Sequence, residues 1–259
     1  MIRYVLTVGF RMKILGVGHL ARFLYRKEQA PYLRTQLKGG RALFKADFRH
    51  HTDQIILRTG EYETEVSAAL SESLGPNEVF WDIGANTGYH SVLIKSLIPS
   101  TQVVSFEPNP EVFLRLIENQ RINGFGDRSL PIALGAEIGV QRLHVVDNGN
   151  SGLTTLKPSS HINYDSQLDI LTLTGDFAVE NFLVPFPDAI KIDVEGSELD
   201  VLKGMPGILQ NSPPHTIIFE ALNTRSLGEI QKLLESFDFS APMPIDDSHN
   251  FISKLYRAR

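Results

Sequence analysis

The chain has 259 residues, of which 42% are hydrophobic, enough for one α/β domain with additional segments at its ends. Its net charge of −5 argues against a nucleic-acid-binding protein, and the absence of cysteine excludes a disulfide framework and thiolate metal ligands. This composition fits a reducing compartment, so we expect a cytoplasmic protein.

The N-terminal segment differs from the rest of the chain. Six positive charges precede the first acidic residue, Glu28, which leaves 19 basic and 30 acidic residues for the remainder. The segment is also apolar, but Arg11 and Lys13 interrupt the apolar run, so neither a secretory signal nor a transmembrane span is expected. Two interpretations stay open: peripheral membrane contact through residues 1–27 as a basic amphipathic helix, or a helix packed on the domain or on a partner subunit.

A glycine pair at 39–40 marks a break in the chain. We therefore predict two units, a basic amphipathic helical segment at residues 1–40 and a single domain at residues 41–259.

Hydrophobic periodicity predicts alternating strands and helices after this break. Residues 41–60 are expected to form one or two strands, most clearly at 54–57. The elements expected after them are a helix at 62–74, strand 79–81, helix 88–98, strand 102–106, helix 110–123, strand 130–134, strands 143–146 and 169–173 around a polar loop, helix 174–182, strand 189–192, a broken helix at 199–209, strand 216–219, helix 226–237 and a last strand near 251–255. This alternation predicts a mostly parallel sheet covered on both faces, with a ligand beyond the carboxyl ends of the strands.

The first sign of function is the turn that follows the strand at 79–81. Asp82, Gly84 and Gly88 form a D-x-G-x-x-x-G motif that leads from a strand into a helix. Gly84 allows a sharp turn and close approach of a ligand, whereas Asp82 can bind a cationic amine or fix the loop. The fingerprints of dinucleotide and phosphate loops, G-x-G-x-x-G and G-x-x-x-x-G-K-[ST], are absent. The motif therefore favours a ligand without a pyrophosphate, such as S-adenosylmethionine.

Glu107 ends the next strand, and Pro108-Asn109-Pro110 then turns the chain into a helix. An acidic residue at this place can bind both hydroxyls of a ribose. The ordered set of Asp82, Gly84 and Glu107 on consecutive strands predicts S-adenosylmethionine as the cofactor.

A second acidic segment follows the strand at 189–192. Strand alternation places Lys191 and Asp193 on one face. We hypothesise that Asp193 accepts the proton of an acceptor hydroxyl or orients it, with Lys191 holding its charge state; His144 and His161 are rival bases. The alternative is a structural salt bridge with a helix-capping loop. We assign no metal ligand, although Asp193, Glu195 and Glu220 carry the oxygen ligands that magnesium accepts, and chelator-insensitive activity would exclude a metal.

With these segments the sequence resembles the FkbM family of methyltransferases. The resemblance covers about residues 55–256 and rests on the segments 82–89, 106–110, 133–135, 150–153 and 190–198, together with Asn119, Asn123 and 202–204. It implies a Rossmann-like class I methyltransferase fold with a seven-stranded sheet, and O-methylation of a sugar, glycan or natural-product hydroxyl. By position it places Asp193 and Glu195 at the acceptor side, and together with Lys191 they are the residues predicted for catalysis. It also implies a cofactor site made of Asp82, Gly84, Ala85, Asn86, Gly88, Tyr89, His90, Ser91, Glu107, Pro108, Asn109 and Ala133.

The predicted function is therefore an S-adenosylmethionine-dependent methyltransferase with a small-molecule or glycan acceptor. The alternative is a non-catalytic module that binds S-adenosylmethionine. A nucleic-acid substrate is not expected, because the catalytic region is acidic and lacks the motif that holds an extruded base. The loop 147–168, the region of Tyr62 and Glu63, and the C-terminal segment are expected to form the acceptor pocket, with His161, Tyr164 and Asp165 as polar contacts. A homo-oligomer is left open.

Overall fold

The structure is a computed structural model that describes residues 32–146, 154–182, 184–247 and 249–256. The basic segment at residues 1–27 lies outside the described residues. Among the described helices, none is both long and apolar enough to cross a membrane.

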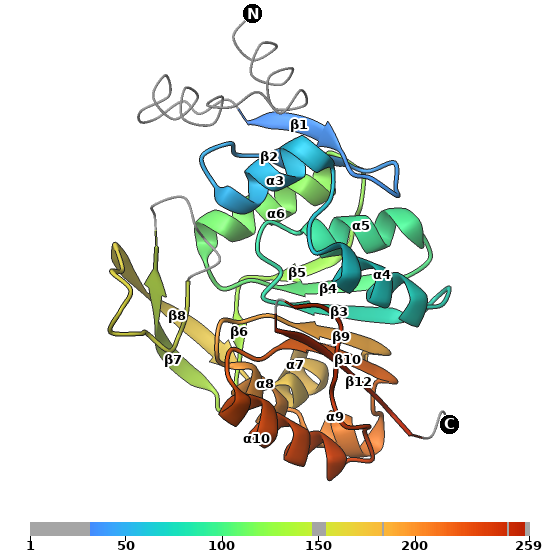
Figure 1. The fold of residues 1–259 in the computed structure, drawn as a ribbon, viewed down its shortest axis with the longest axis vertical. Coiled ribbons are helices and arrows are strands. Elements are labelled where there is room, and N and C mark those ends of the chain that lie inside the picture. The colour runs from blue at the N-terminus through green and yellow to red at the C-terminus, as the bar shows by residue number, and fades with distance from the viewer. Residues whose placement is uncertain (1–31, 147–153, 183, 248, 257–259) are drawn as a thin grey trace, which may run out of the picture.

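A seven-stranded sheet forms the centre of the protein (Figure 1). Its strands are β3 (Val79–Ile83), β4 (Gln102–Phe106), β5 (Arg128–Leu130), β9 (Ala189–Ile192), β10 (Thr216–Glu220), β11 (Met243–Pro244) and β12 (Asn250–Lys254). They follow the order β11-β12-β10-β9-β3-β4-β5, and in this sheet β12 alone runs against its neighbours. The predicted mostly parallel, seven-stranded sheet is thus confirmed, and the carboxyl ends of β3, β4, β9 and β10 meet at one edge.

Helices cover both faces of this sheet, as predicted (Figure 1). They are α4 (Thr64–Ser73), α5 (Tyr89–Leu97), α6 (Pro110–Arg121), α7 (Gly175–Phe182), α8 (Glu198–Lys203), α9 (Pro206–Asn211) and α10 (Thr224–Glu235). Side-chain alternation along β3 decides which helix meets which face. Phe80 packs with residues of α4 and α5, whereas its neighbour Trp81 packs with residues of α7 to α10.

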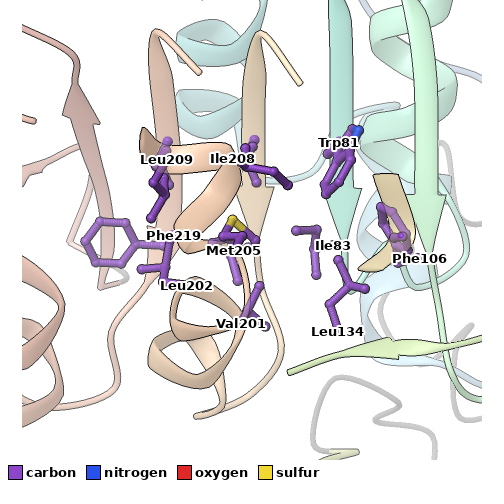
Figure 2. Packing of buried hydrophobic residues seen from close by; sticks show 14 of the residues in the cluster. Trp81, Ile83, Phe106, Leu134, Val201, Leu202, Met205, Ile208, Leu209 and Phe219 are labelled. Carbon is purple, nitrogen blue, oxygen red and sulfur yellow. The ribbon is translucent and has the colours of Figure 1, made fainter. Parts of the chain in front are cut away.

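The larger part of the core lies between the sheet and α7 to α10. Figure 2 shows Trp81 and Phe106 from the sheet beside Met205, Leu202 and other apolar side chains of the helices. The indole and phenyl rings are 5.1 Å apart at an angle of 59°. Trp81 is fully buried, and its Nε1 donates a hydrogen bond to the carbonyl oxygen of Pro185 (3.0 Å), so the polar end of the ring is satisfied inside the core.

A second sheet of three strands stands beside the central one (Figure 1). It contains β6 (Ala133–Leu134), β8 (Ser166–Leu173) and β7 (Gly139–Val145), in that order. The sequence pattern predicted a single strand at 130–134, and this prediction is wrong. The chain leaves the central sheet after β5 and enters the second sheet at β6, with Pro131 between them. Proline has no N–H to donate to a strand ladder, so it suits the point where the chain changes sheets.

The N-terminal part of the described chain is a hairpin followed by a helix. The hairpin joins β1 (Leu33–Gln36) to β2 (Leu43–Ala46), and α3 spans His51–Thr59. The strand predicted most clearly at 54–57 is therefore wrong. Asp53, Ile56 and Leu57 are buried, which is helical spacing, and Gly60 ends the helix in a left-handed conformation by donating its N–H to Ile56 (2.8 Å).

The hairpin packs on the domain that follows it. Leu33 and Phe44 lie in one apolar cluster with Leu57, Tyr89 and Leu93. The predicted boundary at residue 40 falls between the two hairpin strands. We propose that the domain begins at or before Leu33.

Candidate active site

The loop after β3 is held by Asp82, which lies beneath it. Asp82 is 1% exposed, and its Oδ2 accepts hydrogen bonds from the N–H (3.0 Å) and the hydroxyl (2.5 Å) of Ser91. Burial raises the pKa of this carboxyl. Of the two roles considered for Asp82, the geometry supports fixing the loop, since neither Asp82 nor Ser91 lines the cavity above it.

Gly84 forms the point where two loops touch. Its φ is 78°, and its N–H donates to the carbonyl oxygen of Phe106 (3.0 Å). A Cβ at this position would lie 1.8 Å from the carbonyl oxygen of Asp193, in the loop that follows β9. Gly88 (φ 83°) faces Leu116 of α6 instead of the cavity, so it supports the start of α5. Glycine is thus required at 84 both by conformation and by space.

A cavity opens at the carboxyl ends of β3, β4, β9 and β10. This is the edge where the sequence predicted a ligand. Nine of the twelve cofactor residues implied by the family resemblance line it, and Asp82, Gly88 and Ser91 do not. The nine are Gly84, Ala85, Asn86, Tyr89, His90, Glu107, Pro108, Asn109 and Ala133.

Glu107 organises the cofactor side of the cavity. Its Oε2 accepts the N–H of Asn86 (2.9 Å) and its Oε1 accepts the N–H of Asn109 (2.8 Å). Burial raises its pKa to about 7, against the lowering effect of these two hydrogen bonds. A carboxylate offers about four acceptor positions, so both oxygens can still accept bonds from a diol.

The three residues predicted for catalysis also line the cavity. Lys191 is 3% exposed, and its Nζ bonds Oδ2 of Asp193 at 2.7 Å. Burial alone would lower the pKa of Lys191, but the carboxylates of Asp193, Glu63 and Asp82 raise it, so the ammonium stays charged. Glu195 has a left-handed backbone (φ 54°), and burial together with the Asp193 carboxylate raises its pKa to about 9.

Glu220, at the end of β10, completes a group of carboxylates. Single oxygens of Asp193, Glu195 and Glu220 all lie within 4.8 Å of one another. Burial and the neighbouring Asp193 raise the pKa of Glu220 to about 8. Such a group can share one cation or hold protons near neutral pH.

The segment beyond β7 reaches the cavity with other residues than predicted. Thr154, Thr155 and Leu156 line it, and the Thr155 hydroxyl donates to the carbonyl oxygen of Glu195 (2.7 Å). The predicted polar contacts His161, Tyr164 and Asp165 are not among the described lining residues, and neither is His144. His144 instead packs against the Tyr164 ring, 5.2 Å away. Tyr62 and Glu63 do line the cavity, as the sequence predicted.

A methyltransferase FkbM domain matches residues 82–241, which runs from the Asp82 loop past α10. The chain belongs to the FkbM methyltransferase family. Its mostly parallel seven-stranded sheet with helices on both faces is the Rossmann-like fold that the resemblance implied. The family match begins at Asp82, after β1, β2, α3 and α4, so Tyr62 and Glu63 lie outside it.

Two curated relatives of this FkbM protein are methyltransferases. The hexuronic acid methyltransferase AglP of Haloferax volcanii is 34% identical over 156 residues, which cover 58% of this chain and 59% of that protein. Methyltransferase 1 of Beauveria bassiana is 27% identical over 146 residues, covering 48% and 57%. The chain therefore spans about three-fifths of the length of these relatives. Among solved structures, the Pyrococcus abyssi tRNA (uracil-54, C5)-methyltransferase, in complex with S-adenosyl-L-homocysteine, has 12% identity and a TM-score of 0.48, covering 89% of this chain and 45% of that one.

Proposed function

We propose that the protein is an S-adenosylmethionine-dependent O-methyltransferase acting on a hydroxyl of a sugar, glycan or natural-product acceptor. The observation that carries this proposal is the cavity in which the Gly84 loop, Glu107 and the Lys191–Asp193 pair converge at three neighbouring strand ends. Membership of the FkbM family supports methyl transfer, and the relative named as a hexuronic acid methyltransferase supports a sugar acceptor.

The residues around Glu107 fit S-adenosylmethionine. Gly84 lets its loop close against the Asp193 loop at the cavity, Glu107 retains acceptor positions for the ribose hydroxyls, and the carboxylates near Asp193 suit a cationic sulfonium. When bound, the cofactor supplies a methyl group on a sulfonium that becomes neutral on transfer. The protein then has to bring the acceptor oxygen into line and exclude water.

We assign the orientation of the acceptor to the end of β9. Lys191 is buried and fixes Asp193 through a 2.7 Å bond, so this carboxylate faces the cavity in a defined position. Asp193 would accept a hydrogen bond from the acceptor hydroxyl, and Glu195 would border the same space. A structural salt bridge alone would leave turnover insensitive to Asp193.

The cofactor assignment is tested by calorimetric titration with S-adenosylhomocysteine, with NAD titrated in parallel. Binding of the first and not of the second supports the assignment. Transfer of labelled methyl groups to p-nitrophenyl β-D-glucoside and p-nitrophenyl β-D-glucuronide then tests for activity on sugars. Cofactor binding without transfer to these or to a wider set of hydroxyl acceptors would favour the non-catalytic module.

Replacing Glu107 by glutamine should weaken cofactor binding about 10–100-fold, since hydrogen bonds to a charged group contribute about 1.5–3 kcal/mol. The glutamine amide cannot accept both N–H bonds, so the loops at Asn86 and Asn109 would also lose an anchor. Titration with S-adenosylhomocysteine measures the effect. Glu111→Gln, on the adjoining α6 outside the cavity lining, is the matched control, and equal affinity of the two variants would contradict the assigned role.

Binding of S-adenosylmethionine near neutral pH should release more protons than binding of S-adenosylhomocysteine. With pKa values of about 9 and 8, Glu195 and Glu220 hold protons in the unliganded site, and a cationic sulfonium beside them would lower both pKa values. The analogue lacks this charge. We expect a difference on the order of one proton, measured by calorimetry in buffers of different ionisation enthalpy.

Glu220→Gln should reduce that difference, and the exposed Glu137→Gln should not change it. Equal proton release for the two ligands would contradict the assignment. A divalent cation on the three carboxylates would also remove the difference, and a chelator would then restore it.

The acidic character of the cavity and the family membership support a small-molecule or glycan acceptor over a nucleic acid. Peripheral membrane contact through residues 1–27 belongs to the same proposal, since such contact would favour a lipid-linked sugar as the acceptor. Liposome flotation with and without these residues distinguishes membrane contact from packing on the domain.

A further inference from the structure

Glu63 is held in an unusual position at the start of α4. Its backbone is left-handed (φ 45°, ψ 61°), a conformation that a non-glycine residue adopts only where the surrounding contacts hold it. The turn is fixed on both sides: Ser67 donates its N–H to the carbonyl oxygen of Glu63 (2.9 Å), and Tyr62 donates its N–H to the hydroxyl of Tyr89 (3.0 Å). The surrounding contacts thus direct the Glu63 side chain into the cavity wall.

Two buried polar atoms without a hydrogen-bond partner meet at this place. Oε2 of Glu63 lies 3.7 Å from Nε2 of His90, and neither atom has a hydrogen-bond partner among the described residues. His90 is 5% exposed and also lines the cavity. Buried polar atoms are almost always hydrogen-bonded, so two such atoms at the wall of a cavity point to a polar group of a ligand that binds there.

The charges around Glu63 suit a group that exchanges a proton. Oε2 lies 4.0 Å from Nζ of Lys191, the ammonium that Asp193 also binds. Burial raises the pKa of Glu63 to about 6, while Lys191 opposes that rise. Burial and the positive charge of Lys191 hold the pKa of His90 well below its usual value, so the imidazole is neutral and does not compete for the proton. Tyr62, Tyr89, Asp193, Asp246 and Glu220 also interact electrostatically with Glu63.

Glu63 also lies on the side of the cavity away from Glu107. Its charge interacts with Lys191 and Asp193 at the end of β9 and with Glu220 at the end of β10, whereas Glu107 ends β4 on the other side of β3. If Glu107 binds the ribose, Glu63 stands where the acceptor must enter.

We propose that Glu63 belongs to the acceptor site and takes up the proton of the acceptor hydroxyl, while Asp193 orients that hydroxyl. The inference rests on the proposed function. The acceptor O–H bond breaks and its proton passes to the Glu63 carboxylate. The electron pair on the oxygen forms the bond to the methyl carbon as the carbon–sulfur bond breaks, and the electrons of that bond stay on sulfur as a neutral thioether. A base is most effective when its pKa lies near the working pH, and a positioned base contributes about 10²–10⁴-fold to a rate.

The test is the pH dependence of kcat for methyl transfer to the better of the two p-nitrophenyl glycosides, in the wild type and in Glu63→Gln. The wild-type kcat should fall as the pH drops below about 6, because protonated Glu63 cannot accept a proton. Glu63→Gln should lower kcat about 10²-fold and lose this acidic limb, with the affinity for S-adenosylhomocysteine unchanged. Glu65→Gln, exposed on the same helix turn, should behave as the wild type.

If Glu63→Gln kept the wild-type kcat and the acidic limb of the pH profile, the proposed role of Glu63 would be overturned. A lower kcat with the acidic limb retained would also overturn it, since that result marks a structural effect. If Glu63→Gln folds poorly, Glu63→Asp serves: it should keep the limb with a reduced kcat, and losing the limb would overturn the proposal. A wild type that neither binds S-adenosylhomocysteine nor transfers methyl overturns the proposed function itself. Normal wild-type turnover with an unaffected Glu63→Gln overturns only the inference about Glu63.

Discussion

Gly84→Ala is expected to abolish cofactor binding and to destabilise the protein by about 2–4 kcal/mol, from overpacking together with a left-handed backbone. The added methyl group would lie 1.8 Å from the carbonyl oxygen of Asp193, so one of the two loops must move. Both loops line the cavity, and either movement displaces residues of the candidate site.

Two measurements separate the effects of Gly84→Ala. Denaturant unfolding gives the change in the free energy of unfolding, and titration with S-adenosylhomocysteine gives the affinity. Gly126→Ala is the matched control, because a Cβ at Gly126 meets no atom within 4 Å and its φ is not left-handed. Wild-type affinity and stability in Gly84→Ala would show that the loops do not meet as the structure has them.

The cofactor side was predictable because its signals are local in sequence. Asp82 and Gly84 stand at the end of an apolar strand, and Glu107 ends the next one, so strand order alone brings them to one edge. The same reasoning placed Lys191 and Asp193 on one face of β9, and the structure shows Ile190 and Ile192 packed on the other. The position of a residue at the end of a strand is fixed by the strand that precedes it, and a strand can be recognised from the local sequence.

Elsewhere the predictions from sequence were wrong for two reasons. Some elements are determined by contacts between distant parts of the chain, and some short apolar runs suit a helix and a strand equally. The run Ile55-Ile56-Leu57 suits a strand by composition, yet burial of Asp53 and Ile56 against the hairpin makes it helical, and Gly60 was the signal that could have shown this. Pro131 similarly marked the change of sheet between β5 and β6. For short apolar runs, the capping residues carry more information than the apolar residues.

For the acceptor side of the cavity, the sequence indicated which segments take part but not which side chains meet there. Tyr62 and Glu63 were expected near the cavity, but the approach of Glu63 to Lys191 and His90 depends on how α4 packs over the sheet. No spacing in the sequence encodes that contact. Of the loop 147–168, Thr154, Thr155 and Leu156 line the cavity, and the three predicted polar contacts His161, Tyr164 and Asp165 are not among the described lining residues.

Asp193→Asn is expected to reduce kcat about 10²–10³-fold while the affinity for S-adenosylhomocysteine stays within about threefold of the wild type. The amide keeps the size of the side chain but loses the charge that bonds Lys191 at 2.7 Å. The acceptor hydroxyl would lose its anionic partner. The buried ammonium would lose its closest counter-charge, and breaking a fully buried pair costs about 3–5 kcal/mol, an upper bound because Asp193 is partly exposed.

Asp200→Asn is the matched control for Asp193→Asn. Its carboxylate bonds Lys157 at 2.6 Å with both side chains partly exposed, and such surface pairs contribute about 0–1 kcal/mol. Steady-state kinetics with labelled S-adenosylmethionine and a glycoside acceptor would measure kcat, and calorimetry the affinity. Full turnover in Asp193→Asn with intact cofactor binding would remove Asp193 from the mechanism. Glu63, 4.0 Å from Lys191, would then be the carboxylate of the acceptor side that the ammonium supports.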